Sequence, residues 1–190
     1  MDRSRSRAFL LICIDSHTTS EVRVVDANQP EGEFRPIIPR VQDVEYDVTH
    51  HSDGNGAGSW FARISDTAKT FRVVEIPADN PAKENWKELL PARKSITVES
   101  VTAFREYLVI EERNRGLTEV RIRHLASGTD YLIPFAEPSY SLELGPVAEF
   151  DTTLLRYRYT SLVTPLSVFD YNMKTRTAEL KKQQPVLGGY

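Results

Sequence analysis

The sequence is poor in cysteine, in excess positive charge and in long apolar stretches, and each shortage excludes a class of protein. A single cysteine, Cys13, allows no internal disulfide and is compatible with a reducing cytoplasm. Because 24 Lys and Arg stand against 27 Asp and Glu, the chain has no excess of positive charge with which to bind nucleic acid or an anionic membrane. The longest apolar run, residues 8–14, is too short to span a bilayer. We therefore expect a soluble, cytoplasmic protein without a nucleic-acid or membrane partner.

The chain nevertheless has enough apolar residues for a packed domain. It has 190 residues, of which 40% are hydrophobic, and this suffices for one ordinary domain. Cys13 lies inside the apolar run, where a cysteine usually packs as a small hydrophobic side chain. We expect it to be buried and unreactive.

Helix signals are scarce, and strand signals replace them. Pro81 follows an asparagine as a first helical residue would, but nothing of helical period comes after it, so residues 80–85 predict a loop turn. The rest of the chain consists of short segments rich in Val, Ile, Tyr, Phe and Thr, separated by Gly, Pro, Asn and Asp. This pattern is typical of β-strands joined by turns.

One strand pattern recurs along the chain. The segment Val22–Asp26 (VRVVD) returns as Phe71–Glu75 (FRVVE) and Val120–His124 (VRIRH), 49 residues apart each time, and more loosely as Val168–Asn172 (VFDYN) after 48 more. Each copy follows an apolar strand and precedes another strand, and a further strand lies upstream in the last three units. The first unit is the exception, because the charged residues 1–7 stand where its innermost strand should be.

A period of about 40 to 50 residues that holds four antiparallel strands is typical of β-propeller blades, since one small sheet must stack on copies of itself. We predict an all-β fold, a partial β-propeller of about four four-stranded antiparallel blades. Their approximate bounds are 1–40, 41–92, 93–136 and 137–184. A two-sheet sandwich is the alternative, but it gives no reason for the regular spacing. The incomplete first unit predicts that the chain is cut from a larger propeller.

Patterns for catalysis and metal binding are missing. The sequence contains no G-x-S-x-G, and no spacing brings Ser, Asp and His together, so no catalytic residue is assigned. His50 and His51 with Asp47 and Asp53 resemble a metal cluster, but adjacent strand residues point to opposite faces. We expect no metal or cofactor, with one imidazole packed between blades and the other facing solvent. The segment Gly54–Gly58 opens a strand rather than a helix, so it predicts a hairpin turn and not a phosphate site.

Two charged segments have structural interpretations. The run Glu111–Gly116 precedes a turn and predicts a solvated strand end, with docking of a partner as the alternative. The segment Leu154–Ser161 alternates Arg and Tyr from Arg156 onward, as a nucleic-acid platform does. The acidic net charge favours another arrangement, in which the tyrosines pack between sheets and the arginines form ion pairs at the surface.

Several strings, taken together, resemble one family. They are Leu10–Ile12, Thr19–Arg23, Asn28–Arg35, Glu45–His51, Glu84–Trp86, Phe150–Thr152, Leu155–Leu162 and Thr164–Pro165. Over almost its whole length, the chain is similar to the prolyl oligopeptidase family of serine peptidases, and within it to the oligopeptidase B (protease II) group. The resemblance implies the C-terminal half of a seven-bladed propeller that covers an α/β-hydrolase peptidase domain. Residues 185–190 would then begin the connection to that domain.

The same resemblance implies a function without catalysis by this chain. The parent enzyme would hydrolyse short peptides after Lys or Arg through a Ser-Asp-His triad beyond Tyr190, and the propeller would cover the active site and filter substrates by size. Partners would be the chain's own peptidase domain and short basic peptides. The isolated chain should be inactive, and because its blade faces are uncovered it should self-associate or close abnormally. The alternative is a free-standing β-propeller that binds a protein or a glycan.

Three acidic residues fall on the predicted innermost strands, namely Asp47, Glu99 and Glu143. Acidic groups around a channel focus the electric field and attract cations. We therefore name these three residues as candidates for steering cationic peptides.

Overall fold

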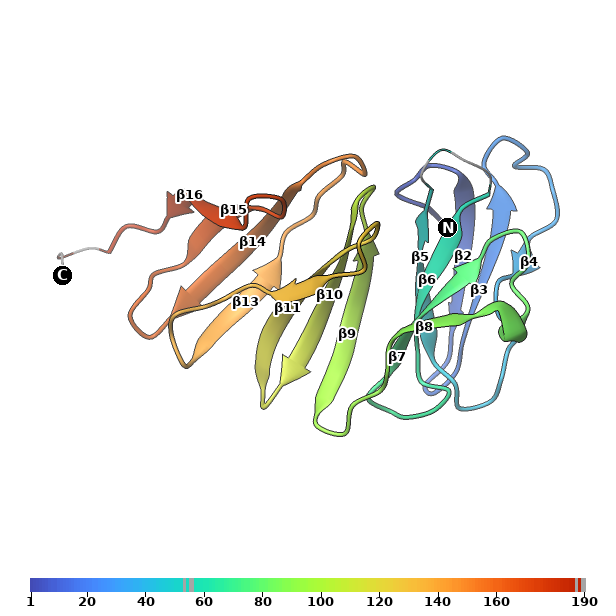
Figure 1. The fold of residues 1–190 in the computed structure, drawn as a ribbon, viewed down its shortest axis with the longest axis horizontal. Helices are drawn as coiled ribbons and strands as arrows, with labels where there is room; N and C mark the ends of the chain where they lie inside the picture. The colour runs from blue at the N-terminus through green and yellow to red at the C-terminus, as the bar shows by residue number, and fades with distance from the viewer. Residues whose placement is uncertain (53, 55–56, 187, 189–190) are drawn as a thin grey trace.

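The computed structural model describes residues 1–52, 54, 57–186 and 188, and these residues form four antiparallel sheets of four strands each. The sheets stack face to face, with the N-terminal pair at one end of the molecule and the C-terminal pair at the other (Figure 1). This arrangement confirms the predicted all-β fold of four-stranded blades. No helix formed by the described residues has the length and hydrophobicity to cross a membrane.

Strand order within each sheet follows the chain. The first sheet contains β1 (Asp2–Arg3), β2 (Phe9–Asp15), β3 (Ser20–Asp26) and β4 (Arg35–Pro36), and the second contains β5 (Tyr46–His51), β6 (Ser59–Ile64), β7 (Arg72–Pro77) and β8 (Lys87–Leu90). The third contains β9 (Ile96–Ala103), β10 (Tyr107–Asn114), β11 (Leu117–His124) and β12 (Asp130–Leu132), and the fourth contains β13 (Tyr140–Leu144), β14 (Leu154–Ser161), β15 (Ser167–Asn172) and β16 (Thr177–Gln183). The recurring pattern therefore marks the third strand of every sheet. A 3-10 turn, η1 (Lys83–Asn85), lies in the β7–β8 connection.

The first sheet is complete, so the expectation that it lacks its innermost strand is wrong. Asp2 and Arg3 pair antiparallel with Leu11 and Leu10 of β2. Two charged residues are too few to show a β pattern, and only their pairing with β2 makes them a strand.

The core lies between the sheets, because consecutive residues of each strand point to opposite neighbours. On β6, Trp60 packs toward the first sheet and Phe61 toward the third, and both are buried. On β14, Tyr157 and Tyr159 pack against the third sheet, which confirms the expectation for the alternating Arg and Tyr segment. Fully burying a large apolar side chain contributes about 1.5–3 kcal/mol, so the inter-sheet contacts hold the stack together.

Cys13 is exposed, contrary to the expected burial. It lies on β2 two residues after Leu11, which is the last β2 side chain in the core of the first two sheets. The apolar run continues beyond the part of the strand that a neighbouring sheet covers. Partial desolvation, with the nearby carboxylates Asp15 and Asp2, raises the pKa of the thiol, so the thiolate is rare at neutral pH.

Candidate functional site

The three candidate steering residues lie on the first strands of three sheets, and each forms an ion pair with an arginine on the second strand of its sheet. The pairs are Asp47–Arg63 at 2.7 Å, Glu99–Arg113 at 2.5 Å and Glu143–Arg158 at 3.7 Å. Such partners reduce, but do not abolish, the negative potential of the carboxylates. Their part in steering stays a prediction.

The Asp47 pair also joins two sheets. The Arg63 guanidinium donates to the Val98 carbonyl on β9 at 2.7 Å and lies 3.5 Å above the centre of the Phe71 ring. Although half of the Asp47 side chain is accessible, desolvation by the surrounding strands raises the pKa of its carboxyl, Asp15 adds to the rise, and Arg63 opposes it. Arg63 thus holds the carboxylate in place while it fastens the second sheet to the third.

His50 forms hydrogen bonds that link the β1–β2 turn of the first sheet to the β5–β6 turn of the second. Its Nε2 lies 2.9 Å from the Ala57 carbonyl oxygen, which can only accept, so Nε2 carries the hydrogen. Its Nδ1 then accepts a hydrogen bond from Ser6 Oγ at 2.7 Å. The ring centre lies 4.7 Å from those of Phe9 and Trp60. Burial lowers the pKa of the imidazole.

His51 faces the other side of β5 and fastens the second sheet to the third. Its Nε2 lies 2.8 Å from the carbonyl oxygen of Arg105, and its ring contacts Phe61 and Phe150. His50 confirms the expectation of one imidazole packed between blades, whereas His51 is half-buried rather than fully turned to solvent, because it packs between the second sheet and the third. Among the described residues, no three His, Cys, Asp or Glu side chains are grouped to hold a metal. Asp53 lies outside the described residues.

The spacing did not predict that a serine and a histidine would meet, yet Ser6 and His50 do. Their geometry does not support nucleophilic catalysis, in which an accessible serine lies beside a histidine oriented by a carboxylate. The imidazole is only 1% exposed, and its second nitrogen bonds a backbone carbonyl. The Ser6 hydroxyl is also bonded to Ser4 Oγ at 3.0 Å. We interpret this pair as structural.

The turn between β5 and β6 requires glycine at one position. Gly58 has a φ of +75°, and a Cβ there would lie 2.1 Å from the carbonyl oxygen of His51. The strands on either side of the turn pair from His51 to Ser59, as expected for a hairpin. Residues 55 and 56 of the glycine-rich segment lie outside the described residues.

Turns on the same edge of the stack as the β5–β6 turn also connect sheets that are distant in sequence. Arg5, between β1 and β2, donates from Nη2 to the Glu149 carbonyl at 2.8 Å, and its guanidinium lies 4.2 Å above the Phe104 ring centre. Arg105, between β9 and β10, forms a 2.7 Å ion pair with Asp151. Together with the two histidines, these contacts link the turns of all four sheets into one layer.

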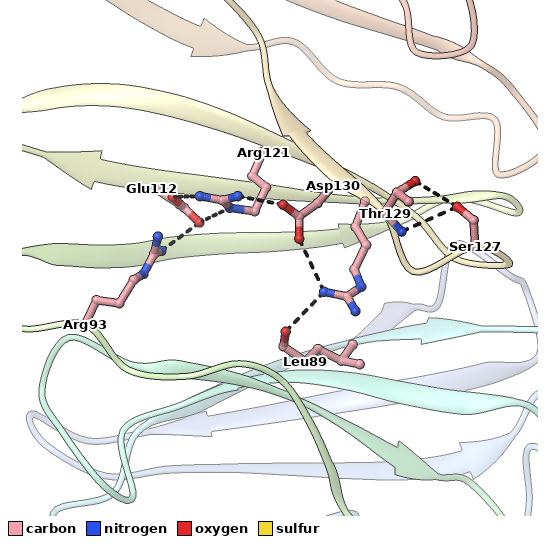
Figure 2. Close-up of polar contacts among 8 residues, drawn as sticks. Leu89, Arg93, Glu112, Arg121, Ser127, Thr129 and Asp130 are labelled. Carbon is pink, nitrogen blue, oxygen red and sulfur yellow. Dashed lines mark hydrogen bonds and ion pairs between the residues drawn. The ribbon is translucent and has the colours of Figure 1, made fainter.

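Glu112 is fully buried, although the run Glu111–Gly116 predicted a solvated strand end. Arg121 binds it from Nε at 2.8 Å and Nη2 at 3.3 Å, and Arg93 Nη2 lies 2.7 Å from its Oε1 (Figure 2). A buried carboxylate requires such partners. Arg113 and residues 115–116 of the run are exposed, as predicted, so only Glu112 departs from a solvated strand end.

The same network continues to the second sheet. Asp130 accepts from Arg121 Nη1 at 2.8 Å, and its other oxygen lies 3.4 Å from Arg123 Nη1. Arg123 also donates to the Leu89 carbonyl on β8 at 3.1 Å (Figure 2). The signal for this network was present in the sequence, because arginine is the second residue of the first three recurring strands. These arginines bind nearby carboxylates in the pairs Arg23–Glu21, Arg72–Asp66 and Arg121–Glu112.

Comparisons with known proteins agree with this architecture. Residues 1–184 match the family model described as prolyl oligopeptidase, N-terminal β-propeller domain. The chain is 35% identical over 187 residues to dipeptidyl aminopeptidase BI of Pseudoxanthomonas mexicana, covering 98% of this chain and 25% of that protein. It is 27% identical over 191 residues to Protease 2 of Moraxella lacunata, covering 100% of this chain and 26% of that protein.

A solved structure also matches the fold over almost the whole chain. Oligopeptidase B from Trypanosoma brucei, in its closed form with covalently bound antipain, superposes with a TM-score of 0.89 at 26% identity, covering 99% of this chain and 27% of that one. The chain thus spans about a quarter of the length of the relatives it matches.

Proposed function

The chain belongs to the prolyl oligopeptidase family, as part of its β-propeller domain, and from this membership we propose that it is the non-catalytic propeller portion of a longer, cytoplasmic serine oligopeptidase. The observation that carries the proposal is the match over residues 1–184, combined with a span of only a quarter of each relative. The likeness to Protease 2 and to oligopeptidase B supports cleavage after Lys or Arg. Bond cleavage would belong to an α/β-hydrolase domain outside these residues.

We propose that the propeller acts by excluding folded proteins from the active site. Unfolding a substrate costs about 5–15 kcal/mol, so a rigid cover with a narrow opening admits short extended peptides and excludes globular domains. The links between sheets through Arg123, His50 and His51 support this role, because they oppose separation of the sheets. Size selection of this kind requires no catalytic side chain in the propeller.

The partner of this portion would be its own peptidase domain. Exposed apolar side chains lie on one edge of the fourth sheet. The strands β13 and β15 begin at this edge and β16 ends there, since Tyr140 pairs with Ser161 and Ser167 pairs with Gln183. On this edge, Leu162 is 95% exposed in the β14–β15 turn, and Val186 is exposed just after β16. Exposed apolar residues of this kind are typical of a docking surface, and the chain leaves the last strand beside them.

The main test uses the natural full-length protein. We expect it to cleave N-terminally blocked short peptides after Lys or Arg, to leave folded proteins intact and to lose activity with a serine-directed covalent inhibitor. We expect residues 1–190 alone to be inactive on the same substrates. A full-length protein without cleavage of either basic or other short peptides would contradict the proposal and favour a binding module.

A second specificity is favoured by one observation. The chain is 35% identical to a protein named dipeptidyl aminopeptidase, which is a higher identity than to Protease 2 or to oligopeptidase B. Release of dipeptides from a free N-terminus would then be the activity. The two specificities separate in one assay, because an N-terminal blocking group abolishes dipeptide release and leaves cleavage after an internal Arg intact.

Steering by the three acidic residues is a further part of the proposal. In each ion pair the carboxylate lies on the first strand and the arginine on the next strand outward, so the negative end of the pair is nearer the propeller axis. We expect the triple variant Asp47→Asn, Glu99→Gln, Glu143→Gln to lower kcat/KM for Lys- and Arg-containing peptides in the full-length enzyme, and more at low salt. Unaltered kcat/KM for these peptides would exclude steering.

A further inference from the structure

A small cavity lies where the turns of the third and fourth sheets meet. The third sheet contributes His124, Ser127 and Thr129 to its lining, and the fourth contributes Lys174 and Arg176. The cavity has a volume of about 160 Å³, which is below the roughly 300–1,000 Å³ of sites for drug-sized ligands. It therefore has room for one small chemical group rather than for a whole organic ligand.

The two cations of this cavity have no anionic partner among the described residues. Lys174 and Arg176 are both exposed in the β15–β16 turn, and the ion pairs of the fourth sheet are formed instead by Arg156, Arg158 and Lys181. None of the described residues that line the cavity is Asp or Glu. The cavity thus has an uncompensated positive charge, which attracts an anion.

Arg176 is held in place by stacking rather than by an ion pair. Its guanidinium lies 4.2 Å from the centre of the Tyr131 ring, and the Tyr131 hydroxyl donates to the Met173 carbonyl at 2.8 Å. The turn itself is ordered, because Asn172 Oδ1 accepts from the backbone N–H of Lys174 at 2.9 Å. Stacking uses the face of the guanidinium and leaves the N–H groups at its edge available to an added acceptor.

The third sheet lines the same cavity with neutral donors. The Ser127 backbone N–H donates to His124 Nδ1 at 3.3 Å, so Nε2 carries the hydrogen of the neutral ring. No described residue accepts that hydrogen. Ser127 Oγ lies 2.9 Å from the same Nδ1 and 2.8 Å from Thr129 Oγ1 (Figure 2). Both hydroxyls can rotate, so each can donate to a new acceptor.

We propose that this cavity binds a phosphate group, either as the free ion or at the end of a small organic phosphate. Lys174 and Arg176 balance its charge from the fourth sheet. The N–H and hydroxyl donors of His124, Ser127 and Thr129 bind its oxygens from the third. A tetrahedral phosphate can meet donors from both sheets at once, whereas a planar carboxylate presents two oxygens and a single charge. The site goes beyond the proposed function, because neither size selection nor peptide cleavage requires it.

Calorimetric titration of the natural full-length protein tests the site. Sodium phosphate is added at pH 7.5, with NaCl adjusted so that the ionic strength stays constant. We expect one saturable site with a Kd on the order of 1 mM, and a Kd for acetate that is about tenfold higher or more. O-phosphoserine distinguishes the two sources, because a Kd near that of phosphate supports a site for esterified phosphate and weaker binding supports a site for the free ion. Absence of saturable phosphate binding, or equal binding of acetate, would overturn the proposal.

The double variant Lys174→Gln, Arg176→Gln tests where the phosphate binds. It should raise the Kd for phosphate about tenfold or more, because both charged donors are lost. The matched control, Lys94→Gln with Arg115→Gln, removes the same two charges from exposed turns elsewhere, and Arg115 shares a positive φ with Arg176, of +50° and +59°. The control should keep the wild-type Kd. Equal effects of the two double variants would show attraction by general surface charge and contradict the site.

Protection of a thiol within the cavity gives a second measurement. In full-length Ser127→Cys, iodoacetamide labelling at position 127 is followed by mass spectrometry. Phosphate at ten times its Kd for this variant should slow the reaction about tenfold, as mass action requires if only the free site reacts. Leu162→Cys, exposed on another edge of the fourth sheet, should react at the same rate with and without phosphate.

Equal rates at position 127 with and without phosphate would show that the ion binds elsewhere. Neither experiment uses peptidase activity, so failure here is distinct from failure of the proposed function.

Discussion

The buried carboxylate of Glu112 shows how one residue can join a sheet to the connection that leads into it. It is 0% exposed and contacts both Arg93 and Arg121. Glu112→Ala removes the carboxylate and leaves two arginines without their main partner. We expect a loss of about 3–5 kcal/mol in the free energy of unfolding, measured by urea unfolding.

Glu106→Ala is the matched control, because Glu106 is exposed in a turn of the same sheet. Its effect should stay within about 0.5 kcal/mol. Equal effects of the two substitutions would show that the Glu112 ion pairs contribute nothing beyond surface electrostatics.

His50 should make stability depend on pH. Burial lowers the pKa of His50 in the folded chain below its ordinary value of 6.5, and the adjacent His51 adds to the decrease. As the pH falls below about 6.5, the unfolded chain therefore binds a proton at this site before the folded chain does. The stabilisation present above that pH is lost as the pH falls through the folded pKa.

Urea unfolding at pH 7.5 and 5.5 measures this effect, with His50→Gln as the comparison. The wild-type chain should lose more stability between the two pH values than the variant does, because glutamine does not titrate. A variant with the same or a larger pH dependence would exclude His50 as the source.

Side-chain environments were predictable from the sequence only where a local pattern sets them. The alternation around Tyr157 and Tyr159 gave their burial correctly, since strand geometry alone fixes which face each residue takes. The burial of Glu112 and the exposure of Cys13 were not predicted. Both depend on how far a neighbouring sheet extends along the strand, which no local pattern reports.

At the scale of elements, the β5–β6 turn gives the clearest test. Gly58 and Gly116 both have positive φ values, of +75° and +87°, but a Cβ on Gly58 would lie 2.1 Å from a backbone oxygen, whereas one on Gly116 meets nothing within 4 Å. Gly116→Ala should cost about 1–2 kcal/mol from backbone strain alone. Gly58→Ala should cost clearly more, as measured by thermal unfolding. Similar losses for the two variants would show that the backbone near His51 relaxes easily.

Element order was largely predictable, because the 49-residue recurrence places equivalent strands in every sheet. The strand β1 escaped prediction, since Asp2 and Arg3 show no β pattern and acquire their conformation from pairing with β2. The same limit applies to the meeting of Ser6 with His50, whose elements are brought together by the stacking of two sheets.

At the scale of the whole molecule, the isolated chain has an uncovered apolar face on β2. Ile14 is 40% exposed there, and such faces favour association. We expect the 190-residue chain to form dimers or larger species in light scattering as its concentration rises. Ile14→Lys should shift it toward the monomer, and Leu162→Lys, on another edge, should shift it less. A strictly monomeric wild-type chain at high concentration would contradict this expectation.

The bond between Arg5 and the Glu149 carbonyl spans 144 residues of sequence, whereas strand pairing within each sheet joins neighbours along the chain. Contacts of such long range close the largest loops and form slowly. During synthesis, the β1–β2 turn must wait without this partner until the β13–β14 connection of the fourth sheet has left the ribosome. The layer of linked turns can therefore be completed only after the first three sheets and the β13–β14 connection have been synthesised.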